Sequence, residues 1–309
     1  MKGFLVTSPT NIRYLTGFTG EGWLVLDGNT KYLLTDSRYT EEAKKIPDMT
    51  LISSLSRFKT LEFEEDSLTV GQMKKLKMKL IPTSGKIEAL RIIKRKDEIE
   101  NIRLAAKITR DTFKFISKRI RPGMTEARLA YELEGYLRVK GGDVAFPPIV
   151  AFNQHSSQPH YSARGNLPLR RGTLLQLDFG AKINGYCADM SRVVFFGPPK
   201  LEWVRAHETV SAAQQKVLSL LRQGEQSGAV LDTAAKKVIA EANFPPYEHG
   251  LGHGVGLDIH ERPRLSVKKD EKLKPGMVFT VEPGIYIEGM YGIRIEDTVL
   301  LKKNGVEVL

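Results

Sequence analysis

The chain has 309 residues, of which 41% are hydrophobic and 27% are charged, and its formal net charge at pH 7 is +11. This composition is typical of a globular protein with one large domain or two, and no uncharged apolar stretch approaches the roughly 20 residues of a membrane span. We therefore expect no membrane segment, and the apolar run after Met1 is too short for a signal peptide. The single cysteine, Cys187, excludes an intrachain disulfide and favours a cytoplasmic protein.

The first 86 residues predict a small α/β domain. Two apolar runs flank Gly28-Asn29 in GWLVLDGNTKYLLTD, which is typical of a β-hairpin. The following SRYTEEAKKI predicts a helix. A Pro/Ser/Gly connection near Gly85 then gives way to a long charged amphipathic helix that continues to about Arg119. We therefore expect two domains, 1–86 and 87–309.

Much of the positive charge is concentrated near this boundary. Between Ser67 and Lys96 there are nine Lys/Arg residues and one acid, Glu88. The segment has neither interleaved aromatic residues nor a nucleic-acid-binding motif. We predict a solvated basic face and no nucleic-acid partner.

After the boundary the chain repeats itself, each half carrying two helices and then a pair of strands. Helices are predicted up to about residue 119 and over 126–141 in the first half, and over 201–224 and 230–244 in the second. The strand pairs are GTLLQLDFGAKINGYCADMSRVVFF and GMVFTVEPGIYIEGMYGIRIEDTVLL. This repetition predicts an α+β fold whose two halves are related by pseudo-twofold symmetry.

The two strand pairs carry carboxylates at matching positions. Asp178 corresponds to Glu282, each two residues before a glycine, and Asp189 corresponds to Glu296, each four residues after a glycine. Four unpaired carboxylates on the inner face of apolar strands would be prohibitively costly. Two divalent cations would balance their charge, so the repeat predicts a dinuclear metal site.

The turn geometry decides whether each pair shares one face. In the first hairpin, a two-residue turn at Asn184-Gly185 would place the acids diagonally, and a turn centred on Ile183-Asn184 would place them directly opposite. In the second hairpin, a loop centred on Gly289 or Met290 would bring the acids together. Either register predicts Cβ atoms roughly 5 to 8 Å apart.

The stretch HGLGHGVGLDIHERP, residues 249–263, holds three of the six histidines on a glycine-rich backbone. Glycine in a helix interior costs roughly 1 kcal/mol relative to alanine, so a loop or a strand edge is predicted here. The small residues allow a close approach to the backbone. His253, at its centre, is the expected fifth ligand beside the four acids.

A site of four carboxylates and one imidazole is rich in oxygen. Such a site suits Mn²⁺, Co²⁺ or Fe²⁺ better than a structural zinc ion. Paired metals lower the pKa of a shared water and polarise the carbonyl group under attack. The predicted chemistry is metal-assisted hydrolysis with two divalent ions, Mn²⁺ being favoured and Co²⁺, Fe²⁺ and Zn²⁺ being alternatives.

Five stretches then point to a family: PHYSARG, LDFGAKINGYCADMSR, HGLGHGVGLDIHERP, TVEPGIY and GIRIEDTVLL. As a set, and in this order, they resemble the pita-bread metallopeptidases, and within them the Xaa-Pro peptidases, prolidase and aminopeptidase P. The resemblance spans residues from about 95 to 309 and implies a pita-bread catalytic domain. NIRYLTGFTGEGWLVL and LLTDSRY also resemble the N-terminal domain of this creatinase/prolidase-like subfamily, which is usually longer.

The resemblance implies a role for each site residue. The implied metal ligands are Asp178, Asp189, His253, Glu282 and Glu296. Asp178 would bind one metal with both oxygens, Asp189 and Glu296 would bridge both metals, and Glu282 would also be the general base. His160 and His260 match histidines that contact substrate and handle protons, His249 matches an imidazole near the proline ring, and Arg294 matches a charge partner of the ligand carboxylates.

Simpler roles are the alternative for the histidines. His160 and His260 flank prolines and would then only shape their loops, and His249 would be a packing residue. We predict that His155 and His207 are ordinary surface residues and that Cys187 is a small buried side chain.

We therefore expect a metallo-exopeptidase that cleaves the bond between a first residue and proline. Dipeptides are slightly favoured as substrates, since Glu261 follows His260 as in prolidase-like members. Aminopeptidase P activity on longer peptides is the alternative, followed by methionine removal, creatinase-like hydrolysis and a non-catalytic binding protein. We also expect a homodimer.

Overall fold

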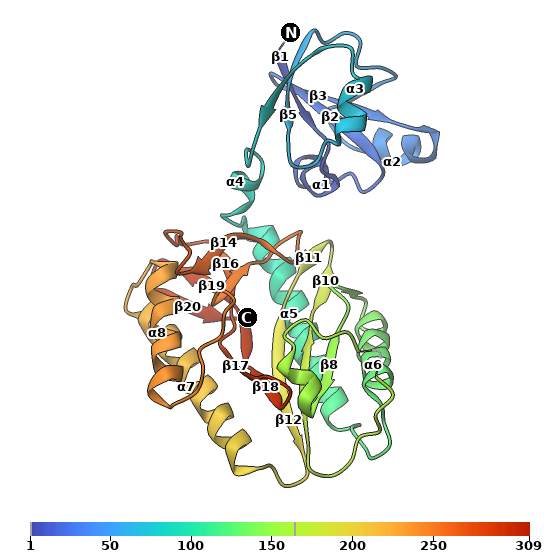
Figure 1. Ribbon diagram of the computed structural model, residues 1–309. Coiled ribbons are helices and arrows are strands. Elements are labelled where there is room, and N and C mark those ends of the chain that lie inside the picture. Colours follow the sequence, from blue (N-terminus) through green and yellow to red (C-terminus); the bar gives the residue numbers. More distant parts are fainter. Residues whose placement is uncertain (1, 164) are drawn as a thin grey trace. The chain divides into compact units, whose positions relative to one another are not determined.

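The computed structural model describes residues 2–163 and 165–309, so Arg164 of the PHYSARG stretch lies outside the described residues. The chain divides into two compact units, Met1–Arg91 and Ile92–Leu309 (Figure 1). The first unit extends beyond residue 86 because its last helix, α4 (Glu88–Arg91), is bonded to the start of the chain. The Arg91 Nη1 atom donates to Asn11 Oδ1 over 2.8 Å in a buried contact.

The first unit is built on a six-stranded sheet in the order β4-β3-β2-β1-β5-β6. The predicted hairpin is confirmed, since Asp27 pairs with Thr30 across a two-residue turn. The predicted helix at SRYTEEAKKI begins with a 3-10 turn, Ser37–Tyr39, and continues as α2. The bounds of the strands and helices of this unit are β1 Lys2–Val6, β2 Gly22–Asp27, β3 Thr30–Thr35, β4 Met49–Ile52, β5 Thr60–Glu64, β6 Lys79–Thr83, α1 Pro9–Thr16, α2 Thr40–Lys44 and α3 Val70–Lys75.

The second unit has four long helices close to the predicted positions: α5 Lys96–Ser117, α6 Glu126–Val139, α7 Leu201–Arg222 and α8 Gly228–Glu241. Side-chain caps explain two of the starts. Thr125 accepts from the N–H of Arg128 before α6, and Ser227 accepts from the N–H of Val230 before α8. α7 buries a stripe at helical spacing, consisting of Trp203, Ala206, Val210, Ala213, Val217 and Leu221. None of the helices in the described part of the chain has the length and apolar character of a membrane span.

The large sheet of the second unit has the order β15-β14-β13-β16-β19-β12-β9-β8, and β20 also pairs with β19. Its strands are β8 Ile149–Phe152, β9 Thr173–Phe179, β12 Met190–Phe196, β13 Gly252–Gly254, β14 Glu261–Ser266, β15 Lys269–Asp270, β16 Val278–Val281, β19 Glu296–Lys302 and β20 Gly305–Val308. Shorter pairings involve β7 Asp143–Val144, β10 Ala181–Ile183, β11 Tyr186–Cys187, β17 Gly284–Ile287 and β18 Tyr291–Arg294.

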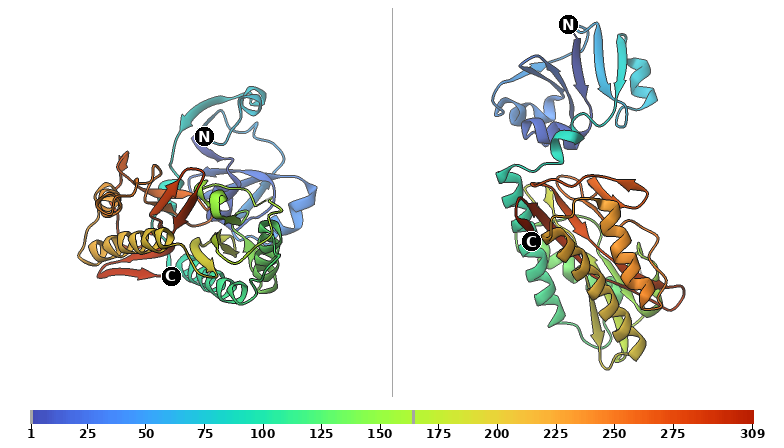
Figure 2. Two further views of the ribbon diagram at one scale, coloured as in Figure 1. Left: turned by 60° about the horizontal axis from the view of Figure 1, so that its bottom comes forward. Right: turned by 90° about the vertical axis from the view of Figure 1, so that its left-hand side faces the viewer.

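This strand order displays the internal repeat. At the centre of the sheet β12 of the first half pairs with β19 of the second, with β9 and β16 outside them and β8 and β13 outside those. Figure 1 and Figure 2 show α5 and α6 along one half and α7 and α8 along the other. The seam between β12 and β19 has two registered pairs, Met190 with Asp297 and Ser191 with Glu296. The predicted α+β fold with two repeated halves is confirmed.

Candidate active site

The first hairpin adopts the diagonal arrangement of its two acids. Pairing of β10 with β11 leaves Asn184 and Gly185 as a two-residue turn, with φ angles of 48° and 87°. Further along the same hairpin, Ser191 of β12 lies directly opposite Asp178 of β9. Asp189 is therefore two positions from the direct partner of Asp178, on the same face of the hairpin.

The second hairpin places its acids opposite each other. β17 and β18 are joined by a three-residue loop centred on Gly289, whose φ is 66°. The pairs on either side, Val281 with Asp297 and Gly284 with Arg294, share one register. Between these pairs, that register sets Glu282 against Glu296. Gly289, rather than Met290, is the centre of the loop.

His253 lies on β13, which pairs with β14 on one side and β16 on the other. The neighbouring glycines are required by these strands. A Cβ atom at Gly252 would lie 2.0 Å from the carbonyl oxygen of Thr280, and one at Gly254 would lie 2.1 Å from that of Arg262. The centre of the glycine-rich stretch, Gly252–Gly254, thus forms a strand inside the sheet, and its small residues admit the adjacent backbones.

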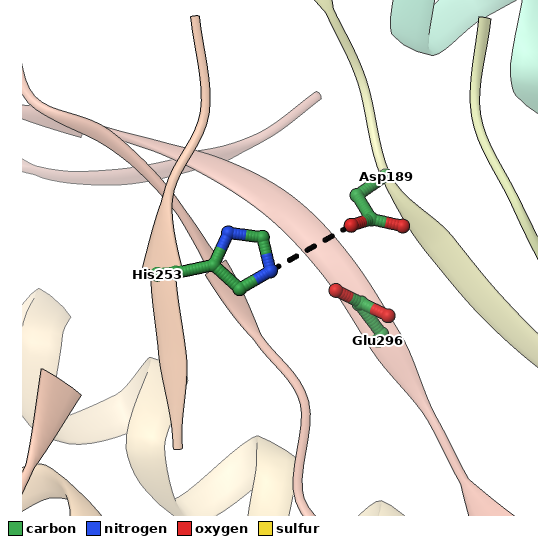
Figure 3. Close-up of side chains that lie close together, drawn as sticks. All are labelled: Asp189, His253 and Glu296. Atoms are coloured by element: carbon green, nitrogen blue, oxygen red, sulfur yellow. Dashed lines mark ion pairs between the residues drawn. The ribbon is translucent and has the colours of Figure 1, made fainter. Parts of the chain in front are cut away.

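The imidazole and the carboxylates converge in one place. Figure 3 shows Asp189, His253 and Glu296 pointing toward one another, and one ligand atom from each lies within 4.8 Å of the others. His253 Nε2 is 3.7 Å from Asp189 Oδ2 and 3.4 Å from Glu282 Oε1. All five predicted ligands line a cavity of about 730 Å³, together with Arg294, His160, His249 and His260.

The acids fit a bound cation. Among the described residues, Asp178 Oδ1, Asp189 Oδ1 and Glu296 Oε1 are buried and have no hydrogen-bond partner. Burial and neighbouring carboxylates raise the pKa of Asp189 and of Glu296 well above the usual range. Burial likewise raises the pKa of Glu282 to about 7. A divalent ion would supply the missing partner for these oxygens and offset the repulsion.

His253 is prepared to bind a metal through Nε2. Its Nδ1 atom donates to the carbonyl oxygen of Gly254 over 3.1 Å, since a carbonyl can only accept. Burial, with a smaller contribution from His260, lowers the pKa of His253 to about 3. The imidazole is therefore neutral, and the lone pair of Nε2 faces the acids.

Arg294 organises the carboxylates from within the protein. Its Nη2 atom donates to Asp178 Oδ2, and its Nε atom donates to Ser191 Oγ over 2.9 Å. Ser191 Oγ in turn donates to Glu296 Oε2 over 2.9 Å. Arg294 Nη1 donates to the hydroxyl of Tyr286 over 2.8 Å. The guanidinium thus orients two of the proposed ligands and leaves one oxygen of each without a partner.

The three predicted histidines take different places on the cavity wall. The ring of His260 lies edge-on to that of His253, with centroids 4.4 Å apart. The His249 ring stacks on Tyr247, and its Nε2 atom is 3.2 Å from the hydroxyl of Tyr286. Burial lowers the pKa of His249 to about 4 and also lowers the pKa of His260.

Two residues near the proposed ligands are absent from the sequence-based prediction: Arg264, which lines the cavity, and Tyr286. Tyr286 connects His249 to Arg294, and Arg264 is the cross-strand partner of His253. Tyr286 ends the stretch TVEPGIY and Arg264 directly follows HGLGHGVGLDIHERP, but the contacts of both depend on strand pairing. Alternation along the strand after HERP would have been the available signal for Arg264.

The prediction that His155 is an ordinary surface residue is wrong. Its side chain is 23% exposed, and its Nδ1 atom is 2.8 Å from Oε1 of the buried Glu126, 29 residues earlier in the chain. His207 is half-buried against Phe195. Cys187 is buried at 1% exposure, as expected for a small core residue.

Fold and site together define a metallopeptidase of the pita-bread type. Residues 100–303 match Metallopeptidase family M24, and residues 1–93 match the Creatinase/Prolidase N-terminal domain. The chain belongs to Metallopeptidase family M24. This membership confirms the family and the enzyme class, a metallo-exopeptidase that uses divalent metal, expected from the sequence.

Individual relatives cover nearly the whole chain. The Xaa-Pro dipeptidase of Pyrococcus furiosus is 32% identical over 98% of this chain and 92% of its own length. The structure of an X-Pro aminopeptidase from Thermotoga maritima has a TM-score of 0.90 and 34% identity, covering 99% of this chain and 95% of its own. The structure of a Xaa-Pro dipeptidase from Bacillus anthracis has a TM-score of 0.92 and 33% identity, covering 99% and 92%.

The raised pKa of Glu282 predicts how the metal-free protein responds to pH. Its folded-state pKa of about 7 lies above the ordinary value of 4.5, so the folded state holds a proton that the unfolded state has lost between these values. The free energy of unfolding is therefore expected to fall as pH rises through this window. Urea unfolding of chelator-treated protein at several pH values measures it.

Glu282→Gln is the matched variant, since an amide cannot titrate. The pH dependence of its unfolding should be flatter than that of the parent protein. Equal pH dependence of the two proteins would contradict the assignment.

Proposed function

We propose that this protein is a dinuclear-metal exopeptidase that hydrolyses the bond between an N-terminal residue and proline, with dipeptides as preferred substrates. The main supporting observation is that three buried carboxylate oxygens have no hydrogen-bond partner among the described residues, and that two of these acids, Asp189 and Glu296, converge with His253. The relatives named Xaa-Pro dipeptidase support the substrate class. Hydrolysis of a panel of Xaa-Pro peptides with added Mn²⁺, Co²⁺ or Zn²⁺ tests the proposal.

The proposed ligands of two divalent ions are Asp178, Asp189, His253, Glu282 and Glu296. Oxygen donors with one neutral imidazole favour Mn²⁺ over the metals that prefer thiolates. When bound, two such ions would offset four carboxylate charges, activate a water and polarise the substrate carbonyl. Metal analysis of protein purified without chelator tests the number and the kind of ion.

The side chains around the proposed metal site bind the peptide and transfer protons. Glu282 is the general base, whose carboxylate would take the proton of the attacking water. Thr280 Oγ1 donates to Glu282 Oε1 over 3.1 Å and holds that carboxylate in place. His260 and His160 line the same cavity, where they contact the peptide and transfer the proton to the leaving nitrogen.

Arg264 supports the preference for dipeptides. It lines the cavity, and its guanidinium makes no hydrogen bond or ion pair with the other described residues. A dipeptide carries a free carboxylate next to its proline ring, and a guanidinium can bind that carboxylate with two parallel hydrogen bonds. A longer peptide has an uncharged amide at this point, so the same arginine disfavours it.

The test is Arg264→Gln. We expect kcat/KM for Ala-Pro to fall roughly tenfold or more, about 1.4 kcal/mol of transition-state stabilisation, while that for Ala-Pro-Ala changes much less. Arg262→Gln is the control, because Arg262 Nε is bonded to Glu271 Oε1 at 3.1 Å and does not line the cavity. Equal losses of kcat/KM on both substrates would show that Arg264 does not bind the carboxylate of the dipeptide. A parent enzyme that prefers the tripeptide tenfold would favour aminopeptidase P activity instead.

We further propose that the protein works as a homodimer in the cytoplasm. A single buried cysteine is consistent with a reducing compartment. Sedimentation of the purified protein would distinguish one chain from two.

A further inference from the structure

Glu126 is a buried carboxylate whose hydrogen bonds to other described residues go to one segment beside the cavity. It begins α6, directly after the capping Thr125, and its side chain is 0% exposed. Its Oε1 atom accepts from the backbone N–H of Phe152 over 2.7 Å and from His155 Nδ1 over 2.8 Å. Its Oε2 atom accepts from the hydroxyl of Tyr161 over 2.8 Å. An ionised carboxylate only accepts, so all three donors are directed at it.

These bonds hold both ends of the segment 152–161. Between them, the ring of His155 stacks on Tyr161, with centroids 4.6 Å apart and planes 17° apart. The far side of the segment contacts the second half of the repeat. Ser156 Oγ accepts from the N–H of Gly292 over 2.7 Å, and the carbonyl of Pro159 accepts from Arg294 over 3.4 Å.

The segment carries three residues of the cavity wall, Pro159, His160 and Tyr161. His160 is exposed, and its side chain makes no hydrogen bond to another residue in the described ranges. Its position is therefore set by the backbone on either side. That backbone turns back on itself, with the N–H of Tyr161 bonded to the carbonyl of Gln158 over 3.1 Å, and Glu126 holds it from α6.

We propose that Glu126 is a positioning residue of the active site, acting through His160 and Tyr161. It touches neither the proposed ligands nor the substrate cavity, and its contribution is to fix where these two side chains meet the peptide. This inference rests on the proposed function for what His160 does. The hydrogen bonds by which Glu126 holds the segment 152–161 do not depend on that function.

The chain offers a matched control in Glu98. This acid lies in the first turn of α5, is 2% exposed, and accepts from the N–H of Arg95 over 2.8 Å and from the hydroxyl of Tyr186 over 3.0 Å. Tyr186 does not line the cavity. Glu98→Gln therefore makes the same chemical change in the same kind of site, away from the substrate.

The experiment compares Glu126→Gln with Glu98→Gln in the full-length enzyme with added Mn²⁺ and Ala-Pro. Glutamine keeps the size of the side chain but turns one acceptor oxygen into a donor that faces other donors. We expect Glu126→Gln to lower kcat/KM roughly tenfold to a hundredfold with unchanged metal content, and Glu98→Gln to stay within about twofold of the parent. Similar losses in both variants would overturn the proposal.

A double-mutant cycle with His160→Ala separates positioning from general structural damage. If Glu126 acts through His160, Glu126→Gln should cost less than about threefold in the His160→Ala background. Losses that simply multiply would overturn the proposal. Should Glu126→Gln fail to fold, Tyr161→Phe removes one of the three bonds, and the same cycle is run with it.

Hydrogen exchange gives a readout that needs no activity. Amides of residues 152–161 should exchange faster in Glu126→Gln than in the parent, while the same amides are unchanged in Glu98→Gln. A parent enzyme that hydrolyses no Xaa-Pro peptide would contradict the proposed function alone. Unchanged protection of this segment in Glu126→Gln would contradict the positioning role alone.

Discussion

Replacing Glu296 by alanine is expected to abolish Xaa-Pro hydrolysis and to release at least one of the proposed metal ions. Glu296 is 1% exposed, its Oε2 atom is held by Ser191, and its Oε1 atom has no hydrogen-bond partner among the described residues. Alanine removes both oxygens and leaves the hydroxyl of Ser191 without its acceptor. A loss of kcat/KM of roughly a thousandfold or more is expected, because the lost ligand serves positioning and electrostatics at once.

Two measurements on the same preparation check this result. Elemental analysis after purification without chelator gives the ions per chain, and initial rates on Ala-Pro with added Mn²⁺ give kcat/KM. Glu98→Gln serves as the control for loss of a buried carboxylate outside the cavity. A folded Glu296→Ala protein with two ions and full turnover would refute the metal site.

His260→Ala should lower kcat while the metals stay bound. The His260 ring lies against His253, and burial together with the charge of Arg264 lowers its pKa below the ordinary value of 6.5. At neutral pH the ring is therefore uncharged and able to donate or accept a proton. Loss of such a group typically costs about 10² or more in kcat.

The split between kcat and KM decides the role of His260. A change confined to KM would make it a binding residue without a part in proton transfer. His160→Ala is the parallel measurement on a second histidine of the cavity wall. His207→Ala is the control. His207 lies on α7, packs against Phe195 of β12 and does not line the cavity.

Much of the active-site architecture was predictable from the sequence because it depends on local geometry. Side chains alternate along a strand, so the spacing of Asp178 and Asp189 around a short turn already confines both to one face. That spacing allowed two registers. The structure has the diagonal one, because Asn184 and Gly185 form a two-residue turn with positive φ angles. In the structure, Thr125 and Ser227 cap the starts of α6 and α8, which lie within two residues of the predicted positions.

What the sequence by itself determined is therefore the inventory of the site: which acids repeat, on which strands they lie, and that a cation must balance them. What only the tertiary structure decided is which residues that lie far apart in the chain contact one another around the site. Arg294 reaches Asp178 across 116 residues, Glu126 reaches His155 across 29, and Arg264 faces His253 through pairing of β13 with β14. Periodicity reports the direction of a side chain relative to its own element. Contacts between elements are set by the packing of the whole sheet and its helices, and the local spacing of residues carries no information about that packing.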